Sequence, residues 1–177
     1  MIYFSSDLHL GHQKEFIYKP RGFNSIEEMN RTIIKNFNQV LNYDDDLYLL
    51  GDTVMGAEPP YYLFKQLNCR VHLIWGNHCT LNKQKELMAS WNVVEICGYA
   101  TLLKYKGYNF YLSHYPTYTS NYDDNKPLKH RVLSLSGHTH SKEKFEECGS
   151  YNVAVDAHNC FPVSIEQIIK DFTDKVS

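Results

Sequence analysis

Short apolar runs alternate with stretches of helical periodicity along the first half of the chain. Ser25 is followed three residues later by Glu28, which is the spacing of a helix capping box. Apolar residues then recur at steps of three and four, as on the buried face of an amphipathic helix. This half of the chain predicts strands at 2–5, 47–50 and 71–75 and helices at 26–42, 60–67 and 81–90.

The second half of the chain is richer in strands. Lys106 and Gly107 separate two β-forming runs, which predicts a hairpin, and Ser164 begins a capping box before a C-terminal helix. The pattern predicts strands at 93–97, 100–105, 108–113, 132–136 and 151–155 and a polar loop over 115–130. We therefore expect an α/β fold, a sandwich of two sheets flanked by helices, in a single domain over residues 1–177.

The amino-acid composition and net charge limit the classes of partner and the cellular location expected for this chain. The formal net charge of −2 provides no broad positive field, so an extended nucleic acid is disfavoured as a partner. There are five cysteines, an odd number without a C-x-x-C pair, and no secretory signal precedes the first predicted strand. These features predict reduced cysteines and a cytoplasmic location. No apolar run approaches the length of a membrane span.

Five short polar motifs each follow a predicted strand, and they share the ligand types that divalent metals accept. They are Asp7-Leu8-His9, Gly51-Asp52, Gly76-Asn77-His78, His114 and Gly137-His138-Thr139-His140. Because ligands of open α/β sheets collect where strands end, we expect these side chains to converge. A glycine directly precedes the ligand in three of the motifs, where the chain must approach an ion closely. This set is what a two-metal hydrolytic centre requires, and Asp52 is the candidate to bridge the two metals.

The order of these motifs resembles that of the calcineurin-like metallophosphoesterases, whose signature is D-x-H, G-D, G-N-H-[DE], H and G-H-x-H. The resemblance spans residues 7–140 and implies a four-layer α/β/β/α arrangement of the two sheets and their helices. It also implies two divalent metal ions. Because the expected ligands are all nitrogen and oxygen donors, we place manganese first, with iron, zinc, nickel or cobalt as alternatives. One metal would bind Asp7, His9 and His140, the other Asn77, His114 and His138, and Asp52 would bridge them. His78 would be the catalytic residue that contacts the phosphoryl group and protonates the leaving oxygen.

We expect a phosphoesterase that hydrolyses a small phosphodiester or phosphomonoester, with a nucleotide among the candidates. Two close cations would lower the pKa of a shared water, and the resulting hydroxide would attack phosphorus in line. One alternative is a nuclease acting on DNA or RNA, although this chain has no room for additional DNA-tracking domains. The other is a protein-interaction scaffold that keeps the fold but catalyses weakly.

Several residues near the motifs have more than one interpretation. Arg21 could bind a substrate phosphate, His12 could contact substrate, and Tyr115 could stack on a base or sugar. Each could equally be an ordinary loop residue. Asp156 could orient a metal ligand or only shape a turn. Cys79 stands where the family has Asp or Glu, so it is either the loss of a useful carboxylate or an inert small residue.

Overall fold

The computed structural model describes residues 1–119 and 125–176, and its first sheet has five strands. Their order is β4-β3-β2-β1-β9, in which β1 to β4 are parallel to their neighbours and β9 is antiparallel to β1. The strands are β1 (Ile2–Ser5), β2 (Asp46–Leu50), β3 (Arg70–Ile74), β4 (Val93–Gly98) and β9 (Val163–Ser164). Strands are therefore present at the four predicted positions of this sheet, and the two-residue strand β9 is an addition that the sequence pattern does not predict.

The second sheet has four strands in the order β5-β6-β7-β8. They are β5 (Ala100–Tyr105), β6 (Tyr108–Ser113), β7 (Val132–Ser136) and β8 (Tyr151–Asn152). The predicted hairpin joins β5 to β6, and β6, β7 and β8 run parallel. The strand predicted at 151–155 is shorter, because Asn152 Oδ1 accepts a hydrogen bond from the Ala154 amide and turns the chain. Ala154 then forms a bridge with Ser6, which connects the two sheets at this point.

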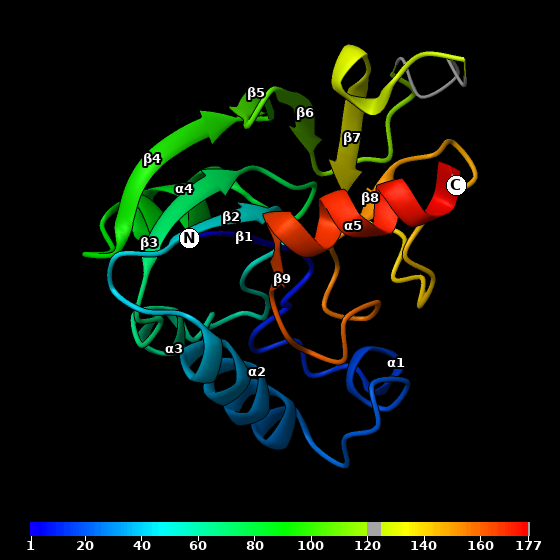
Figure 1. Cartoon of the computed structure of the whole chain (residues 1–177). Helices are drawn as coiled ribbons and strands as arrows, with labels where there is room; N and C mark the ends of the chain where they lie inside the picture. The colour runs from blue at the N-terminus through cyan, green and yellow to red at the C-terminus, as the bar shows by residue number, and fades with distance from the viewer. Residues whose placement is uncertain (120–124, 177) are drawn as a thin grey trace.

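Helices flank the sheets, as Figure 1 shows. Ser25 caps the long helix α2, because its Oγ accepts the Glu28 amide at 3.2 Å as the capping box predicts. The helices are α1 (Glu15–Tyr18), α2 (Ile26–Val40), α3 (Tyr61–Phe64), α4 (Leu81–Met88), the 3₁₀ segment η2 (Leu128–His130) and α5 (Ile165–Val176). In the described part of the chain, no helix has the length and apolar character needed to cross a membrane.

Two clusters of buried apolar side chains hold the layers together. The helix-side core joins α2, α3 and α4 to one face of the first sheet through residues such as Ile33, Phe64 and Leu87. The inter-sheet core lies between the two sheets and includes the apolar side of α5. Its fully buried members include Phe4, Leu50, Phe110, Leu133, Leu135 and Ile165. The predicted fold class, two sheets flanked by helices, is confirmed.

The motif-bearing loops leave the sheets at a common edge. The strands β1, β2 and β3 are parallel, so the loops after them emerge on the same side, and the parallel pair β6 and β7 behaves likewise. Backbone hydrogen bonds then connect the loops directly. The amide of His9 donates to the Asp52 carbonyl at 3.0 Å, and the amide of Gly137 donates to the His114 carbonyl at 3.0 Å. The fold thus holds residues from five separate loops in one place.

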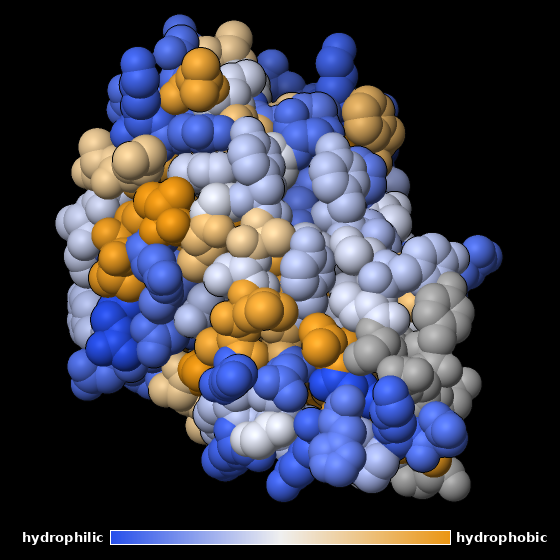
Figure 2. Space-filling model, turned by 90° about the horizontal axis from the view of Figure 1, so that it is seen from above, coloured by the Kyte–Doolittle hydropathy of each residue, from blue (hydrophilic) through white to orange (hydrophobic). Residues whose placement is uncertain are grey.

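The inter-sheet core predicts that two leucines contribute very differently to the free energy of unfolding. Leu133 on β7 is fully buried, whereas Leu102 on β5 is 67% exposed. Exposed apolar residues of this kind are part of an ordinary protein surface, and Figure 2 shows hydrophobic residues (orange) interspersed with hydrophilic ones (blue) on the upper face of the molecule. Because Leu133→Ala removes buried methyl groups and leaves a cavity, we expect it to lower the free energy of unfolding by about 2–5 kcal/mol. The matched Leu102→Ala variant should change it by less than about 0.5 kcal/mol. Urea unfolding measures both, and equal losses would contradict this packing.

Candidate metal centre

Five of the predicted ligands have left-handed backbone conformations. The φ angles are 55° at Asp7, 48° at His9, 47° at Asp52, 75° at His138 and 54° at His140. Residues other than glycine rarely adopt positive φ, and such strain concentrates at functional sites. Here the conformation turns the chain sharply as each loop leaves its strand. The backbone at these residues thus ends the regular strand and directs the side chains of the predicted ligands.

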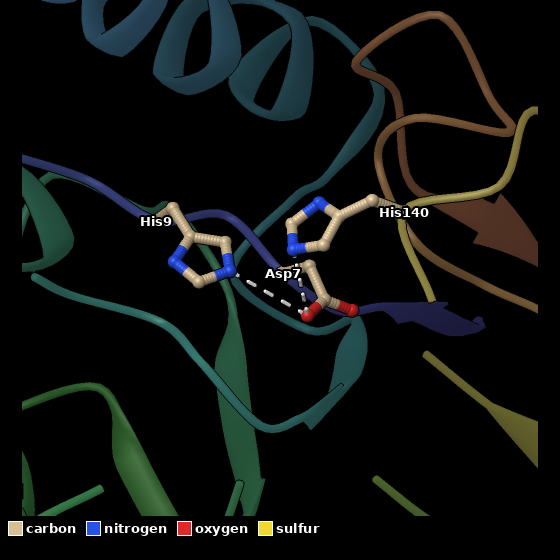
Figure 3. Close-up of side chains that lie close together, drawn as sticks. All are labelled: Asp7, His9 and His140. Carbon is tan, nitrogen blue, oxygen red and sulfur yellow. Dashed lines mark ion pairs between the residues drawn. The ribbon is translucent and has the colours of Figure 1, made fainter. Parts of the chain in front are cut away.

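Asp7, His9 and His140 form the first group of donors (Figure 3). Asp7 Oδ1 lies 3.6 Å from His9 Nε2 and 3.9 Å from His140 Nε2. Asp7 Oδ1 and both ring nitrogens of His9 are buried without a hydrogen-bond partner among the described residues. Leaving a buried polar atom unpaired costs about 1–3 kcal/mol, so this group lacks a partner that a cation would supply.

Asp52 and His114 belong to a second group, which shares Asp7 with the first. His114 Nδ1 lies 2.8 Å from the Leu50 carbonyl, so it carries the proton and donates, and Nε2 keeps its lone pair. That Nε2 faces Asn77 Oδ1 at 2.8 Å, His138 Nδ1 at 3.2 Å and Asp52 Oδ2 at 3.5 Å. Electron-pair donors that converge in this way repel one another unless a cation lies between them.

Asp52 lies between the two groups. Its Oδ2 is 3.5 Å from His114 Nε2 on one side and 3.9 Å from His9 Nε2 on the other. Its Oδ1 accepts the backbone amide of His78 at 3.0 Å, which fixes the orientation of the carboxylate. This placement fits the bridging position that the sequence predicts for Asp52.

Glycines allow these close approaches. A Cβ atom on Gly76 would collide with the carboxylate of Asp52, and a Cβ atom on Gly137 would collide with Ser6 Oγ and Asp7 Oδ2. Any side chain at either position would therefore displace a candidate ligand. The proposed reason for glycine before the ligands agrees with this geometry.

The protonation states suit metal binding. Burial alone raises the pKa of Asp7, but contact with His9 and the Ser6 hydroxyl and the charges of His114 and His9 outweigh it, so its pKa is well below the usual range. Burial lowers the pKa of His9, and the Asp7 carboxylate offsets only part of that effect. Burial and then His114 lower the pKa of His138. Near neutral pH the Asp7 carboxylate is thus ionised, and the lowered pKa values of His9 and His138 favour their neutral imidazoles, the forms that bind metal.

Comparison with known proteins agrees with this arrangement. The model of the calcineurin-like phosphoesterase family matches residues 1–159. The chain belongs to this family. An uncharacterized protein of Methanocaldococcus jannaschii is 33% identical over 180 residues, covering 96% of this chain and 89% of its own. The gene 66 protein of Mycobacterium phage L5 is 26% identical over 160 residues, covering 78% and 77%.

A solved structure extends the comparison to the fold. The protein of unknown function AQ665 from Aquifex aeolicus superposes with a TM-score of 0.72 at 28% identity, covering 96% of this chain and 98% of that one. Membership of the calcineurin-like phosphoesterases implies hydrolysis of phosphoesters with divalent metal ions. The candidate ligand groups of this chain provide suitable oxygen and nitrogen donors for such ions.

Arg21 differs from its expected role as a substrate contact. Its side chain is only 2% exposed, and Nε and Nη2 bind the two oxygens of Asp156 at 2.9 and 2.8 Å. The remaining donors reach the carbonyls of Leu8 and Asp7 and the sulfur of Met29. With every N–H group engaged inside the protein, the guanidinium has none left for a substrate phosphate. Of the two interpretations of Arg21, these contacts favour a residue that holds the loops together over a substrate contact.

The contacts of Asp156 favour the orienting interpretation over the one in which it only shapes a turn. Its Oδ2 lies 3.1 Å from His140 Nδ1, so the protonated Nδ1 donates to it and Nε2 points toward Asp7. Burial lowers the pKa of His140, but the hydrogen bond to Asp156 and the charges of Asp7 and Asp156 more than compensate and raise it. A carboxylate that fixes the tautomer of a ligating histidine is a common support of metal sites.

The other candidate substrate contacts lie beside the predicted ligands. His12 packs its ring 5.5 Å from that of His9, and Tyr115, which is 52% exposed, lies 4.6 Å from the ring of His138. His78 is exposed with its ring 5.9 Å from that of His9. Part of the predicted 115–130 loop, residues 120–124, lies outside the described residues.

Cys79 fits the interpretation of an inert small residue. Its Sγ accepts the Gly76 amide at 3.3 Å and packs against the helix-side core. Burial raises the pKa of the thiol, so it stays neutral near pH 7. The sulfur thus accepts a hydrogen bond from a backbone amide that could equally donate to a carboxylate at this position.

Sequence reasoning missed two supports of the site. Ser6 Oγ donates to Asp7 Oδ2 at 2.6 Å, and the Leu50 carbonyl fixes the tautomer of His114. The only sequence signal for Ser6 was its position next to Asp7. A carbonyl group carries no sequence signal at all.

The contact between Asp156 and His140 predicts a specific effect on metal affinity. Asp156→Asn removes the charge that orients His140 and leaves Arg21 buried without its carboxylate. We expect Mn²⁺ affinity, measured by calorimetric titration of the metal-free protein, to fall by about 10–100-fold. Stability should fall by about 3–5 kcal/mol, because a buried ion pair loses one partner. Exposed Asp174 provides the control Asp174→Asn, and equal Mn²⁺ affinity in both variants would contradict the orienting role.

Proposed function

We propose that this chain, acting as the single domain predicted from its sequence, is a dinuclear-metal-dependent phosphoesterase for a small phosphodiester or phosphomonoester. A nucleotide is among the candidate substrates. The observation that supports it most strongly is the set of buried, unpaired donors, Asp7 Oδ1 and both nitrogens of His9. Residues from five loops converge on this point, and a structure without cations leaves them unsatisfied.

In this proposal, the two ions divide the donors as the family signature implies. Asp7, His9 and His140 would hold one ion, Asn77, His114 and His138 the other, and Asp52 would contact both. When bound, divalent ions supply Lewis acidity toward phosphoryl oxygens and the capacity to ionise water near neutral pH. Manganese is the first candidate, since all these ligands are oxygen or nitrogen donors.

His78 is the proposed catalytic residue. Its backbone amide is held by Asp52 Oδ1 at 3.0 Å, while its side chain is exposed beside His9. An imidazole in this position can hydrogen-bond to a phosphoryl oxygen and donate a proton to the leaving oxygen. The rigid backbone anchor combined with a free side chain suits that role.

The surroundings of the centre favour a small substrate. A cavity of about 250 Å³ is lined by His12, Gln13, Lys14, Met55 and Gly56, on the side of the centre where the rings of His12 and His9 meet. Tyr115 provides an aromatic ring beside His138. We propose His12 and Tyr115 as substrate contacts, for the ester group and for a base or sugar ring.

The alternatives have less support. A nuclease would need a basic groove, and the chain has a formal net charge of −2. A scaffold would not need the unpaired buried donors of Asp7 and His9. The cytoplasmic location stays a prediction.

Hydrolysis of bis(p-nitrophenyl) phosphate and p-nitrophenyl phosphate by metal-stripped protein, titrated with Mn²⁺, tests the proposal. We expect turnover to require metal and to be abolished by Asp52→Asn. His78→Ala should lower kcat by about 10²–10⁴-fold, the usual contribution of a general acid, with little change in Mn²⁺ affinity. Exposed His130, outside the centre, gives the matched control His130→Ala, which should keep full activity.

Two outcomes would contradict this proposal. Protein that binds no Mn²⁺ in calorimetry would remove its basis. Protein that binds two Mn²⁺ ions but hydrolyses neither ester would favour the scaffold alternative. If His78→Ala loses metal affinity as strongly as activity, His78 is a ligand rather than a proton donor.

A further inference from the structure

A second group of metal-binding side chains lies on the first sheet, away from the loops of the metal centre. It consists of His72 on β3 and Glu95 and Cys97 on β4. His72 and Glu95 are direct partners in the register of the two strands, and Cys97 follows Glu95 at the spacing that returns to the same face. The group thus connects β3 to the edge strand β4.

The donor atoms are close enough to share an ion. One donor atom each from His72, Glu95 and Cys97 lies within 4.8 Å of the others, and His72 Nδ1 is 2.6 Å from Glu95 Oε2. Zinc–ligand distances of about 2.0–2.3 Å place neighbouring ligand atoms of a tetrahedral site roughly 3.3–3.8 Å apart. Small side-chain rotations would bring the donor atoms from their present separations to those of a tetrahedral site.

The imidazole of His72 is already oriented for such a role. Its Nε2 lies 2.9 Å from Asp46 Oδ1, and Asp46 is itself held by Arg70 through bonds of 3.0 and 2.8 Å. The ring of Tyr48 stacks on the imidazole at 4.3 Å with an interplanar angle of 12°. An Nε2–H group that donates to a carboxylate leaves Nδ1 facing Glu95 and Cys97. This is the arrangement by which carboxylates orient metal-binding histidines.

We propose that His72, Glu95 and Cys97 bind one zinc-class divalent ion at a site distinct from the dinuclear centre. A thiolate ligand sets this site apart, because the seven ligands proposed for the dinuclear centre are oxygen and nitrogen donors. Glu95 has a side chain that is 55% exposed, so solvent can supply a fourth ligand. The proposal does not depend on the proposed function.

Binding at this site exchanges protons for the ion. Burial, and then the charge of Glu95, raise the pKa of the Cys97 thiol to about 11. The thiol is therefore protonated near neutral pH, and without an ion the Nδ1–H group of His72 donates to Glu95 Oε2 at 2.6 Å. Binding must release both of these protons to solvent. Affinity should consequently rise with pH. Without an ion, the same atoms form a network in which His72 lies between the carboxylates of Asp46 and Glu95.

The site would stabilise a weak part of the sheet. The pairing of β3 with β4 has register shifts between Val71 and His72 and between Leu73 and Ile74. The strand β4 forms an edge of its sheet, and its outward residues Val94 and Ile96 are 53% and 37% exposed. An ion shared by β3 and β4 would hold this edge in place.

Titration of the full chain with Co²⁺ tests the proposal, because cobalt bound to a thiolate gives a near-ultraviolet charge-transfer band that oxygen and nitrogen ligands do not give. We expect one thiolate-bound Co²⁺ per chain. The band should disappear in Cys97→Ser and persist in Asp52→Asn. Cys79→Ser is the matched control, since Cys79 is the cysteine beside the dinuclear centre.

Two further measurements keep the test decisive. Exposed Glu95→Gln should not disturb folding and should weaken Co²⁺ binding to Cys97 by at least about 10-fold. Zn²⁺ should raise the Tm of Asp52→Asn but not of the Asp52→Asn/Cys97→Ser double variant, because only a ligand of the folded state stabilises it. Absence of the band, its survival in Cys97→Ser or its loss in Cys79→Ser would overturn the proposal.

Discussion

The carboxylate of Asp7 is the group on which the geometry of the candidate metal centre depends. Its Oδ2 is held by Ser6 Oγ and by the backbone amide of His138, which joins the first loop of the chain to a loop 131 residues later. Its Oδ1 is left buried and unpaired toward His9 and His140. Oδ2 therefore joins two distant loops through hydrogen bonds, and Oδ1 stays available for a cation. The absence of a side chain at Gly137 follows from the same crowding.

Around this carboxylate, a buried ion pair controls geometry rather than stability. Arg21 contacts the carbonyl of Asp7, the carboxylate of Asp156 and, at 3.3 Å, His140 Nδ1. Buried ion pairs contribute little net stability, since the loss of hydration offsets their attraction. Their value here lies in fixing the left-handed turn at Asp7 and the tautomer of His140 together.

The secondary-structure elements and the candidate metal ligands of this protein could be read from the sequence because their signals are local. An apolar run followed by Gly51-Asp52 or by Gly76-Asn77-His78 contains both the strand and the ligand that leaves it. Arg21 could not be assigned in this way, since its partner Asp156 is 135 residues away and nothing near Arg21 indicates burial. The early end of β8 has a similar origin, because the side chain of Asn152 turns the chain within an otherwise β-like run.

The candidate metal centre and the group of His72, Glu95 and Cys97 on β3 and β4 differ in whether their polar atoms have partners when no ion is bound. In the β3–β4 group, each polar atom of His72 already has a partner, so this group is stable as an ion-pair network and an ion must displace a proton. At the candidate metal centre, neither nitrogen of His9 has a hydrogen-bond partner among the residues that the structure describes, and five of the predicted ligands have strained backbone angles. Strain of about 1–3 kcal/mol at each such residue must be offset by the rest of the fold. The parallel strands that precede these loops provide that support, and they keep the donors together without an ion, so an ion that bound here would spend little of its binding free energy on ordering the loops.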